Sequence, residues 1–265
     1  MTLIASDKRI EAAAQALREA RQKRIPVPRI SETYGIQNVA EAYAVAHCNA
    51  QQALQAGGRV SGKKIGLTSK TVQQQMGVDQ PDYGVLLNDM EYLSGAELPM
   101  GRLIQPRAEG EIAFVVGRDL DEEGLTWGKF LRSIEYALPA IEIVDSAIAN
   151  WQLTLVDTIA DNASSGVYVL GLEPRKLGQV DLLSCGMDFR KNGVTESVGS
   201  GAACLGHPLL AAHWLARTMF QLGSPLKAGD VILSGALGPM FPLAQNDQLN
   251  LSISGLGSVM CRIDA

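Results

Sequence analysis

From residue 60 onward the chain consists of short apolar runs separated by Gly, Pro, Asn and Asp, and no other feature constrains its fold as strongly. This pattern favours strands joined by turns over long helices. The dipeptide Asn192-Gly193 adds a strong hairpin signal. Two helices are expected to interrupt the strands, at residues 127–136 and 208–222, and Pro208 suits the first helical position of the second. The expected strands cover residues 60–67, 84–87, 109–116, 140–144, 166–170, 187–191, 231–234, 249–253 and 258–263.

The first 59 residues have helical patterns instead. Residues 7–22 place their apolar side chains on one stripe, which describes an amphipathic helix. A second helix is expected to begin after Asn38, with Glu41 in a capping-box-like position, and to end at Gly57-Gly58. We therefore predict an α+β fold, in which a helical N-terminal region at residues 1–59 packs on a β-rich body at residues 60–265.

Charge and hydropathy exclude several classes of partner. The formal net charge is -5 and no run of Lys or Arg reaches five residues, so nothing marks a surface for nucleic acid or an anionic membrane. No stretch approaches the roughly 18 apolar residues that a membrane span requires, and the N-terminus lacks the apolar core of a signal peptide. We expect a cytoplasmic protein with a small-molecule ligand.

The chain is poor in the side chains that bind zinc. Its four cysteines lie far apart without C-x-x-C spacing, and we expect them to be buried thiols. It has only three histidines, of which His47 falls in a helical pattern. Any metal site must therefore be built mainly from oxygen ligands.

The most informative segment is the expected strand that begins at Glu109. Side chains alternate between the faces of a strand, so Glu109 and Glu111 share one face while Ile112 and Phe114 lie on the other. Glu142 stands in another apolar run, where an unpaired charge is costly. A divalent cation would relieve the repulsion and lost hydration of such carboxylates, and oxygen ligands suit Mg²⁺ or Mn²⁺ better than zinc. The alternative is that Glu109 and Glu111 are solvated at a strand end, which is commoner for an isolated E-x-E.

Other polar residues have both a functional and a structural interpretation. Lys63 and Lys64 point in opposite directions in a strand, so one should face inward, where a lysine near a metal can act as an acid, a base or an anion clamp. Asp82 lies beside a proline and a glycine, which is also ordinary turn chemistry. Residues 151–166 form an unusually polar segment that includes Ser164, and local caps explain its residues equally well. No nucleotide-binding glycine motif and no Ser-His-Asp or Cys-His spacing is present.

Five blocks of sequence are distinctive when taken together. They are residues 62–69 (GKKIGLTS), 80–84 (QPDYG), 105–113 (QPRAEGEIA), 156–164 (VDTIADNAS) and 233–237 (LSGAL). In combination they resemble the 2-oxopent-4-enoate (2-hydroxypenta-2,4-dienoate) hydratases of aromatic meta-cleavage pathways. The 4-oxalocrotonate decarboxylases, also in the fumarylacetoacetase-like superfamily, are close relatives. The likeness runs almost from end to end of the chain.

The resemblance implies a mixed β-roll of the fumarylacetoacetase C-terminal-domain type behind the helical region, assembled into homo-oligomers. Glu109, Glu111 and Glu142 match the positions of metal ligands in that family. The implied cofactor is Mg²⁺ or Mn²⁺. The implied partners are a 2-oxo or 2-hydroxy dienoic acid as substrate and, in a complex, a decarboxylase or aldolase of the same pathway.

The resemblance also implies roles for three other residues. Lys64 and Asp82 match positions proposed for proton transfer and substrate orientation, and Ser164 matches a polar pocket position that binds substrate. The reaction expected is conversion of 2-hydroxypenta-2,4-dienoate to 4-hydroxy-2-oxopentanoate, with the metal as a Lewis acid at the 2-oxygen. Decarboxylation of 4-oxalocrotonate is the alternative, because the same chelate serves both reactions. A non-catalytic partner subunit is a third reading, and a hydrolase is disfavoured by the scarcity of histidine.

Overall fold

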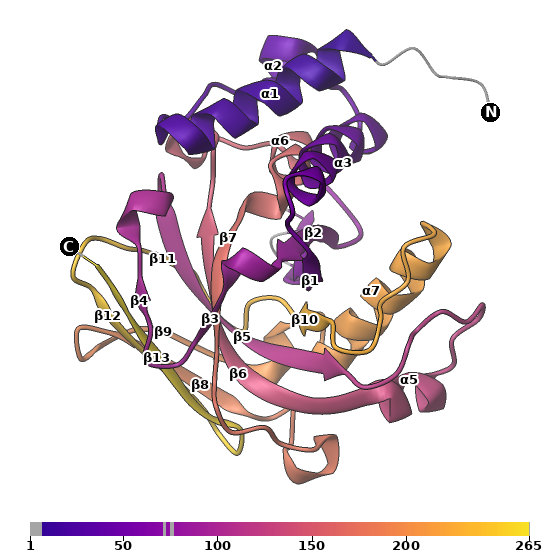
Figure 1. The fold of residues 1–265 in the computed structure, drawn as a ribbon. Coiled ribbons are helices and arrows are strands. Elements are labelled where there is room, and N and C mark those ends of the chain that lie inside the picture. The colour runs from indigo at the N-terminus through magenta and orange to yellow at the C-terminus, as the bar shows by residue number, and fades with distance from the viewer. Residues whose placement is uncertain (1–6, 71–72, 75–76, 265) are drawn as a thin grey trace.

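The computed structural model describes residues 7–70, 73–74 and 77–264 of the chain. Figure 1 shows the N-terminal helices at one end of the molecule, above the β-sheets. The predicted α+β class is confirmed by this arrangement. Residues 1–6 of the predicted helical region and residue 265 of the predicted body lie outside the described residues.

The N-terminal helices begin where the sequence predicts. In α1 (Lys8–Lys23) the side chain of the N-cap Asp7 accepts a hydrogen bond from the backbone N–H of Arg9. In α3 (Val39–Gln55) the side chain of the N-cap Asn38 accepts from the backbone N–H of Glu41. Between them lies α2 (Ile30–Tyr34), a five-residue helix that no sequence pattern predicted. Its single turn is too short to produce a readable apolar period.

The larger sheet has eight strands and carries the candidate site. Its order is β2-β1-β10-β5-β6-β7-β3, and β11 pairs with β5 beyond this path. The pairs β1–β10 and β3–β7 are parallel and the other neighbours are antiparallel. Its strands are β1 (Val60–Gly66), β2 (Asp82–Leu87), β3 (Glu91–Leu93), β5 (Pro106–Val116), β6 (Ile134–Asp145), β7 (Ser165–Leu170), β10 (Val231–Leu233) and β11 (Phe241–Pro242).

The smaller sheet has five strands in the order β4-β13-β12-β8-β9. The predicted hairpin at Asn192-Gly193 is confirmed, because it joins β8 to β9. The sequence analysis did not identify β9 itself, since that edge strand is mostly exposed and has no apolar alternation. The strands are β4 (Glu97–Leu98), β8 (Gly186–Lys191), β9 (Val194–Ser200), β12 (Gln248–Ile253) and β13 (Gly257–Ile263).

Two predictions about the later helices need correction. The helix expected at residues 127–136 ends early: α5 (Trp127–Ser133) gives way to β6 at Ile134, because Ile134 and Tyr136 pair with β5. The segment 151–166, expected to be a loop, contains α6 (Leu155–Ala160), which begins with a capping box between Thr154 and Asp157. The third helix, α7 (Pro208–Gln221), begins at Pro208 as predicted.

Three hydrophobic clusters hold these layers together. The largest lies between the two sheets and also takes in the buried face of α7. A second joins α1 and α3 to four residues of the body, Ala147, Ile148, Ile159 and Ala160. The third covers the opposite face of the larger sheet, around β10 and β7. The division of the chain between residues 59 and 60 stays a prediction, and it coincides with the passage from α3 to β1.

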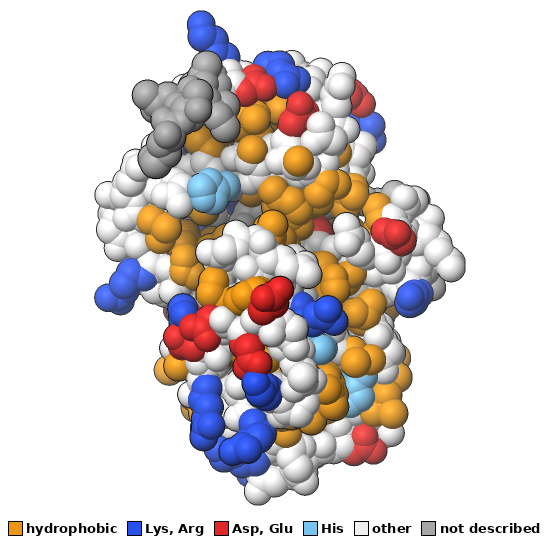
Figure 2. All heavy atoms as spheres, turned by 90° about the vertical axis from the view of Figure 1, so that its right-hand side faces the viewer, with side chains coloured by type: hydrophobic (Ala, Val, Ile, Leu, Met, Phe, Trp, Pro, Cys, Tyr) orange, Lys and Arg blue, Asp and Glu red, His pale blue; other side chains and the backbone are white. Residues whose placement is uncertain are grey.

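Hydrophobic and charged side chains share one face of the molecule. Figure 2 shows hydrophobic side chains gathered across the middle of one face, with acidic and basic side chains mixed above and below them. That face therefore presents no continuous basic surface. Among the described residues, no helix combines the length and apolar character needed to cross a membrane.

Candidate metal centre

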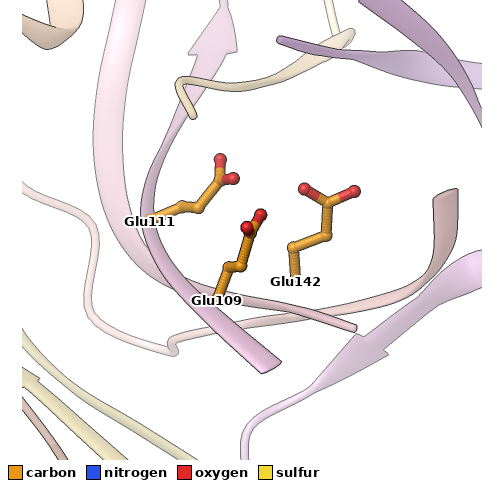
Figure 3. A group of neighbouring side chains, drawn as sticks. All are labelled: Glu109, Glu111 and Glu142. Carbon is orange, nitrogen blue, oxygen red and sulfur yellow. The ribbon is translucent and has the colours of Figure 1, made fainter. Parts of the chain in front are cut away.

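Three glutamates converge from two neighbouring strands. Glu109 and Glu142 are direct partners across β5 and β6, and Glu111 lies two residues further along β5 on the same face. Each offers a carboxylate oxygen, and these three atoms lie within 4.8 Å of one another. Figure 3 shows the three side chains pointing toward a common space. The structure thus brings together the three predicted ligands, whose binding of a metal stays a prediction.

The carboxylates lack the partners that burial normally requires. Glu111 is 0% exposed and Glu142 is 1% exposed. Among the described residues, Oε1 of Glu111 and both carboxylate oxygens of Glu142 have no hydrogen-bond partner, although Oε1 of Glu142 forms an ion pair with Lys64. Burial, followed by the charge of Glu142, raises the pKa of Glu109 to about 7 and that of Glu111 well above its ordinary value. Orphaned oxygens and repelling charges fit a divalent cation held between them.

Lys64 faces this centre from β1. In register it lies beside Leu233 of β10, which lies beside Ala113 of β5, so Lys64 and the glutamates share one face of the sheet. Its Nζ atom is 3.3 Å from Oε1 of Glu142. Burial opposes its charge, but Glu142 and then Glu109 raise the pKa of Lys64 above its ordinary value. The neighbouring Lys63 points to the opposite face as predicted, and it is buried too.

Asp82 lies one strand further from the centre. It is the first residue of β2, on the same face as Lys64, and not part of a turn. It is buried, and its Oδ1 atom has no hydrogen-bond partner among the described residues. Burial raises the pKa of Asp82 to about 6, opposed by the charge of Lys64. The carboxyl can therefore change its protonation state near neutral pH.

Ser164 ends a strained turn that follows α6. This turn, η4 (Asn162–Ser164), has three consecutive residues in the left-handed region, with φ of 57° at Asn162, 51° at Ala163 and 54° at Ser164. Such a conformation costs roughly 1–2 kcal/mol per residue other than glycine, and local strain of this kind clusters at functional sites. Ser164 is buried, and its Oγ lies 3.5 Å from Oγ1 of Thr158.

Asn162 joins this turn to the strand that carries Asp82. Its side chain accepts a hydrogen bond from the backbone N–H of Val85 at 2.7 Å and donates one to the carbonyl of Val85 at 2.8 Å. The backbone carbonyl oxygen of Asn162 lies close to Gly84, and a Cβ atom at position 84 would be only 2.5 Å from it. This strand position therefore requires glycine. The turn that holds Ser164 therefore packs against β2 beside Asp82.

Sequence reasoning missed one contributor to the site. The backbone N–H of Gly235 donates to Oε2 of Glu111 at 2.8 Å, and Gly235 has φ of +102°, which side chains rarely adopt. A glycine placed just after a strand was the available signal. Asp157, by contrast, is structural: its carboxylate caps α6 and accepts from the backbone N–H and side chain of Ser31. The sequence left open whether the polar residues of segment 151–166 act as local caps or line a site.

Comparison with known proteins gives consistent matches. Residues 46–264 match the family described as fumarylacetoacetate (FAA) hydrolase C-terminal. A TodF product hydratase of Pseudomonas putida F1 is 51% identical over 250 residues, covering 94% of this chain and 93% of that protein. A 2-keto-4-pentenoate hydratase of Paraburkholderia xenovorans LB400 is 49% identical over 255 residues, covering 96% of this chain and 95% of that protein.

A solved structure matches almost the whole chain. It is the 4-oxalocrotonate decarboxylase of Pseudomonas putida G7, complexed with magnesium and adipate. The TM-score is 0.92 at 31% sequence identity, and the match covers 97% of each chain. The match therefore takes in the helical region as well as the sheets.

Proposed function

The chain belongs to the fumarylacetoacetate hydrolase C-terminal family, and within that family we propose that it is a metal-dependent hydratase. The reaction is conversion of 2-hydroxypenta-2,4-dienoate (2-oxopent-4-enoate) to 4-hydroxy-2-oxopentanoate. The observation that carries the proposal is the 49% identity, over 96% of the chain, with a protein named 2-keto-4-pentenoate hydratase. The resemblance found in the five sequence blocks is confirmed by the same relatives.

Glu109, Glu111 and Glu142 would hold Mg²⁺ or Mn²⁺. The magnesium named with the related decarboxylase supports this choice, as do the orphaned oxygens of Glu111 and Glu142. When bound, the cation supplies a Lewis acid that stabilises negative charge on the 2-oxygen of an oxo acid. Gly235 orients one ligand, because its N–H fixes Oε2 of Glu111 and leaves Oε1 directed into the centre.

Lys64 and Asp82 divide substrate orientation and proton transfer between them. With its raised pKa, Lys64 stays cationic at neutral pH, so it attracts the substrate's anionic end and donates hydrogen bonds. Asp82 has a pKa of about 6 and is mostly ionised at pH 7, so Oδ1 can accept the proton of the 2-hydroxyl group. Return of a proton to C5 gives the 2-oxo-3-enoate. Addition of water, with oxygen at C4 and hydrogen at C3, then completes the reaction.

Ser164 is proposed to bind the substrate. Its hydroxyl lies in a buried turn that packs against β2, the strand of Asp82. A hydroxyl can donate to or accept from a substrate oxygen without adding charge to a centre that is already rich in charges.

Decarboxylation of 4-oxalocrotonate is the second candidate. The TM-score of 0.92 with a decarboxylase favours it, since the two folds are nearly superimposable. Sequence identity favours hydration, because that decarboxylase is 31% identical to this chain whereas the hydratase is 49% identical. We place hydration first for this reason.

The setting of the enzyme follows from the same resemblance. We propose that it acts in the cytoplasm, in a meta-cleavage pathway for aromatic compounds, as a homo-oligomer. We also propose that it can associate with a decarboxylase or aldolase partner, and that residues 1–59 form a helical region on a catalytic domain at residues 60–265.

The test is turnover by the purified chain. The protein is incubated with Mg²⁺ and either 2-hydroxypenta-2,4-dienoate or 4-oxalocrotonate, while dienol absorbance and CO₂ release are followed in parallel. We expect rapid loss of the dienol, formation of 4-hydroxy-2-oxopentanoate, and no CO₂ above background. Chelation of the metal should stop the reaction, and excess Mg²⁺ or Mn²⁺ should restore it.

Two variants make the test specific to the site. Glu111→Gln should lose metal-dependent turnover while its circular dichroism spectrum is retained. Glu123→Gln is the matched control, because Glu123 is exposed in a turn between β5 and α5 and is not one of the three clustered carboxylates, and it should behave as wild type. Full activity in Glu111→Gln would refute the metal centre, and CO₂ release that outpaces hydration would replace the first candidate with the second.

A further inference from the structure

Arg21 lies at the junction between the helical region and the candidate site. It projects from the last turn of α1, and its Nη2 atom donates to Oδ1 of Asp161 at 2.7 Å and to the backbone carbonyl of Asp145 at 3.0 Å. Its Nη1 atom is 3.5 Å from Oδ2 of Asp145. Both carboxylates are almost fully buried, and Arg21 itself is 31% exposed. One guanidinium thus links two buried acids from different elements of the body.

The carboxylates of both aspartates accept hydrogen bonds from backbone N–H groups of other segments of the body. Asp145 ends β6, three residues beyond Glu142, and its carboxylate accepts from the backbone N–H groups of Ile104 and Gln105, just before β5. Asp161 directly precedes the turn η4, and its Oδ2 atom accepts from the backbone N–H of Ala147 at 2.8 Å. Arg21 therefore contacts Asp145, which ends one of the strands of the candidate metal centre, and Asp161, which directly precedes the turn of Ser164.

The turn depends on such support. Its three left-handed residues are unfavourable in isolation, so neighbouring groups must hold them in place. Within the turn, Asn162 is fixed to Val85, and on the C-terminal side the side chain of Ser165 donates to the carbonyl of Asn162 at 2.8 Å. On the N-terminal side, the support is the Asp161 carboxylate, which is anchored by Arg21.

We propose that Arg21 is a positioning residue for catalysis: through Asp161 it holds the turn that presents Ser164 to the substrate. The inference rests on the proposed function. It assigns a part in substrate binding to α1, which precedes the residues 46–264 that match the family. The helical region would therefore complete the site and not only cover the sheet.

Arg21 is suited to this role by its chemistry. A guanidinium has a planar set of donors that can serve two acceptors at once, whereas a lysine ammonium cannot reproduce that geometry. Figure 1 shows α1 lying above α6, which ends next to Asp161. Arg21, Asp145 and Asp161 line part of a cavity of about 580 Å³. Replacing Arg21 by alanine would extend this cavity toward the two carboxylates.

The test compares Arg21→Lys and Arg21→Ala with wild type in the full-length, Mg²⁺-loaded protein. We measure KM and kcat for 2-hydroxypenta-2,4-dienoate and the Kd of the unreactive analogue 2-oxopentanoate by calorimetry. For Arg21→Lys we expect KM and Kd to rise together by about tenfold, with kcat changed by less than about threefold. A merely structural residue would lower apparent kcat with the folded fraction and leave KM and Kd unchanged.

Arg18→Lys is the matched control. Arg18 lies one turn earlier in α1, and its Nη1 atom donates to Oδ1 of Asn49 in α3 at 2.6 Å, so the change loosens the helical region without touching Asp145 or Asp161. Its KM and Kd should equal those of wild type. An equal rise in KM for Arg18→Lys and Arg21→Lys would overturn the proposal, because general loosening would then explain both.

Chemical rescue provides a second readout. Millimolar guanidinium should enter the cavity left by Arg21→Ala and return KM toward the wild-type value, with no effect on the control variant. Guanidinium that restores the melting temperature but not KM would overturn the proposal. So would an Arg21→Lys variant that folds and has wild-type KM and Kd, whether or not Arg21→Ala folds. Wild-type protein without turnover would refute the proposed function, and the inference with it.

Discussion

Glu109→Gln should stabilise the metal-free protein at high pH and not at low pH. Burial and the charge of Glu142 raise the pKa of Glu109 from 4.5 to about 7. A raised pKa means that the folded state favours the protonated carboxyl, so this contribution to stability is complete below pH 4.5 and is lost as the pH rises through 7. Glutamine removes the ionisation and with it the loss of stability.

The magnitude follows from the two pKa values of Glu109. At pH 8 the ionised Glu109 costs the folded state about 3 kcal/mol, whereas at pH 5 the cost is below about 1 kcal/mol. Urea unfolding in the presence of a chelator, followed by circular dichroism at both pH values, measures the difference. We expect Glu109→Gln to exceed wild type by about 3 kcal/mol in the free energy of unfolding at pH 8 and to nearly equal it at pH 5.

Metal should nearly cancel the difference in stability at pH 8. With Mn²⁺ at 100 times its Kd, wild type should gain about 2.7 kcal/mol, and Glu109→Gln should gain much less at that concentration. The exposed Glu123→Gln variant should follow wild type in every condition. A Glu109→Gln variant that is less stable than wild type at both pH values, by the same margin, would refute the reasoning, because charge repulsion could not then be the cause.

The remaining predictions concern the proton shuttle, the turn and the metal. Asp82→Asn should lower kcat by about 10²-fold or more, with Mn²⁺ affinity nearly unchanged; in wild type, kcat should fall as the pH drops through about 6, because Asp82 then becomes protonated. A flat pH profile would contradict that role. Asn162→Ala removes both hydrogen bonds to Val85 and should lower the free energy of unfolding in urea by about 2 kcal/mol. An unchanged free energy of unfolding would mean that these hydrogen bonds do not stabilise the fold. The Kd of Mn²⁺, measured by calorimetry from pH 5 to pH 8, should decrease with rising pH, since Glu109 and Glu111 must lose protons to bind; a constant Kd would place the metal elsewhere.

Local sequence patterns determined part of the site. Strict alternation in β5 was enough to put Glu109 and Glu111 on one face, because the side-chain period of a strand depends on the strand alone. Glu142 was different. Its position opposite Glu109 depends on the pairing of β5 with β6, and only the family resemblance supplied it in advance.

Tertiary contacts determined the remainder. Arg21 and Asp161 are 140 positions apart, and α1 by itself gives no reason to connect one of its surface arginines with the site. Similarly, β6 starts at Ile134 because residues from Ile134 onward pair with β5. This pairing ends α5 earlier than the helical pattern of residues 127–136 suggests. The short helix α6 escaped prediction because six residues are too few to show a helical period.

The central claim is that one divalent cation binds between Glu109, Glu111 and Glu142. Anomalous diffraction from crystals soaked in Mn²⁺ locates such an ion directly. The account predicts a single strong peak bounded by the three carboxylates, with metal–oxygen distances of about 2.1 Å, and the loss of that peak in Glu111→Gln. A peak elsewhere in the molecule, or none at this centre at saturating Mn²⁺, would contradict it.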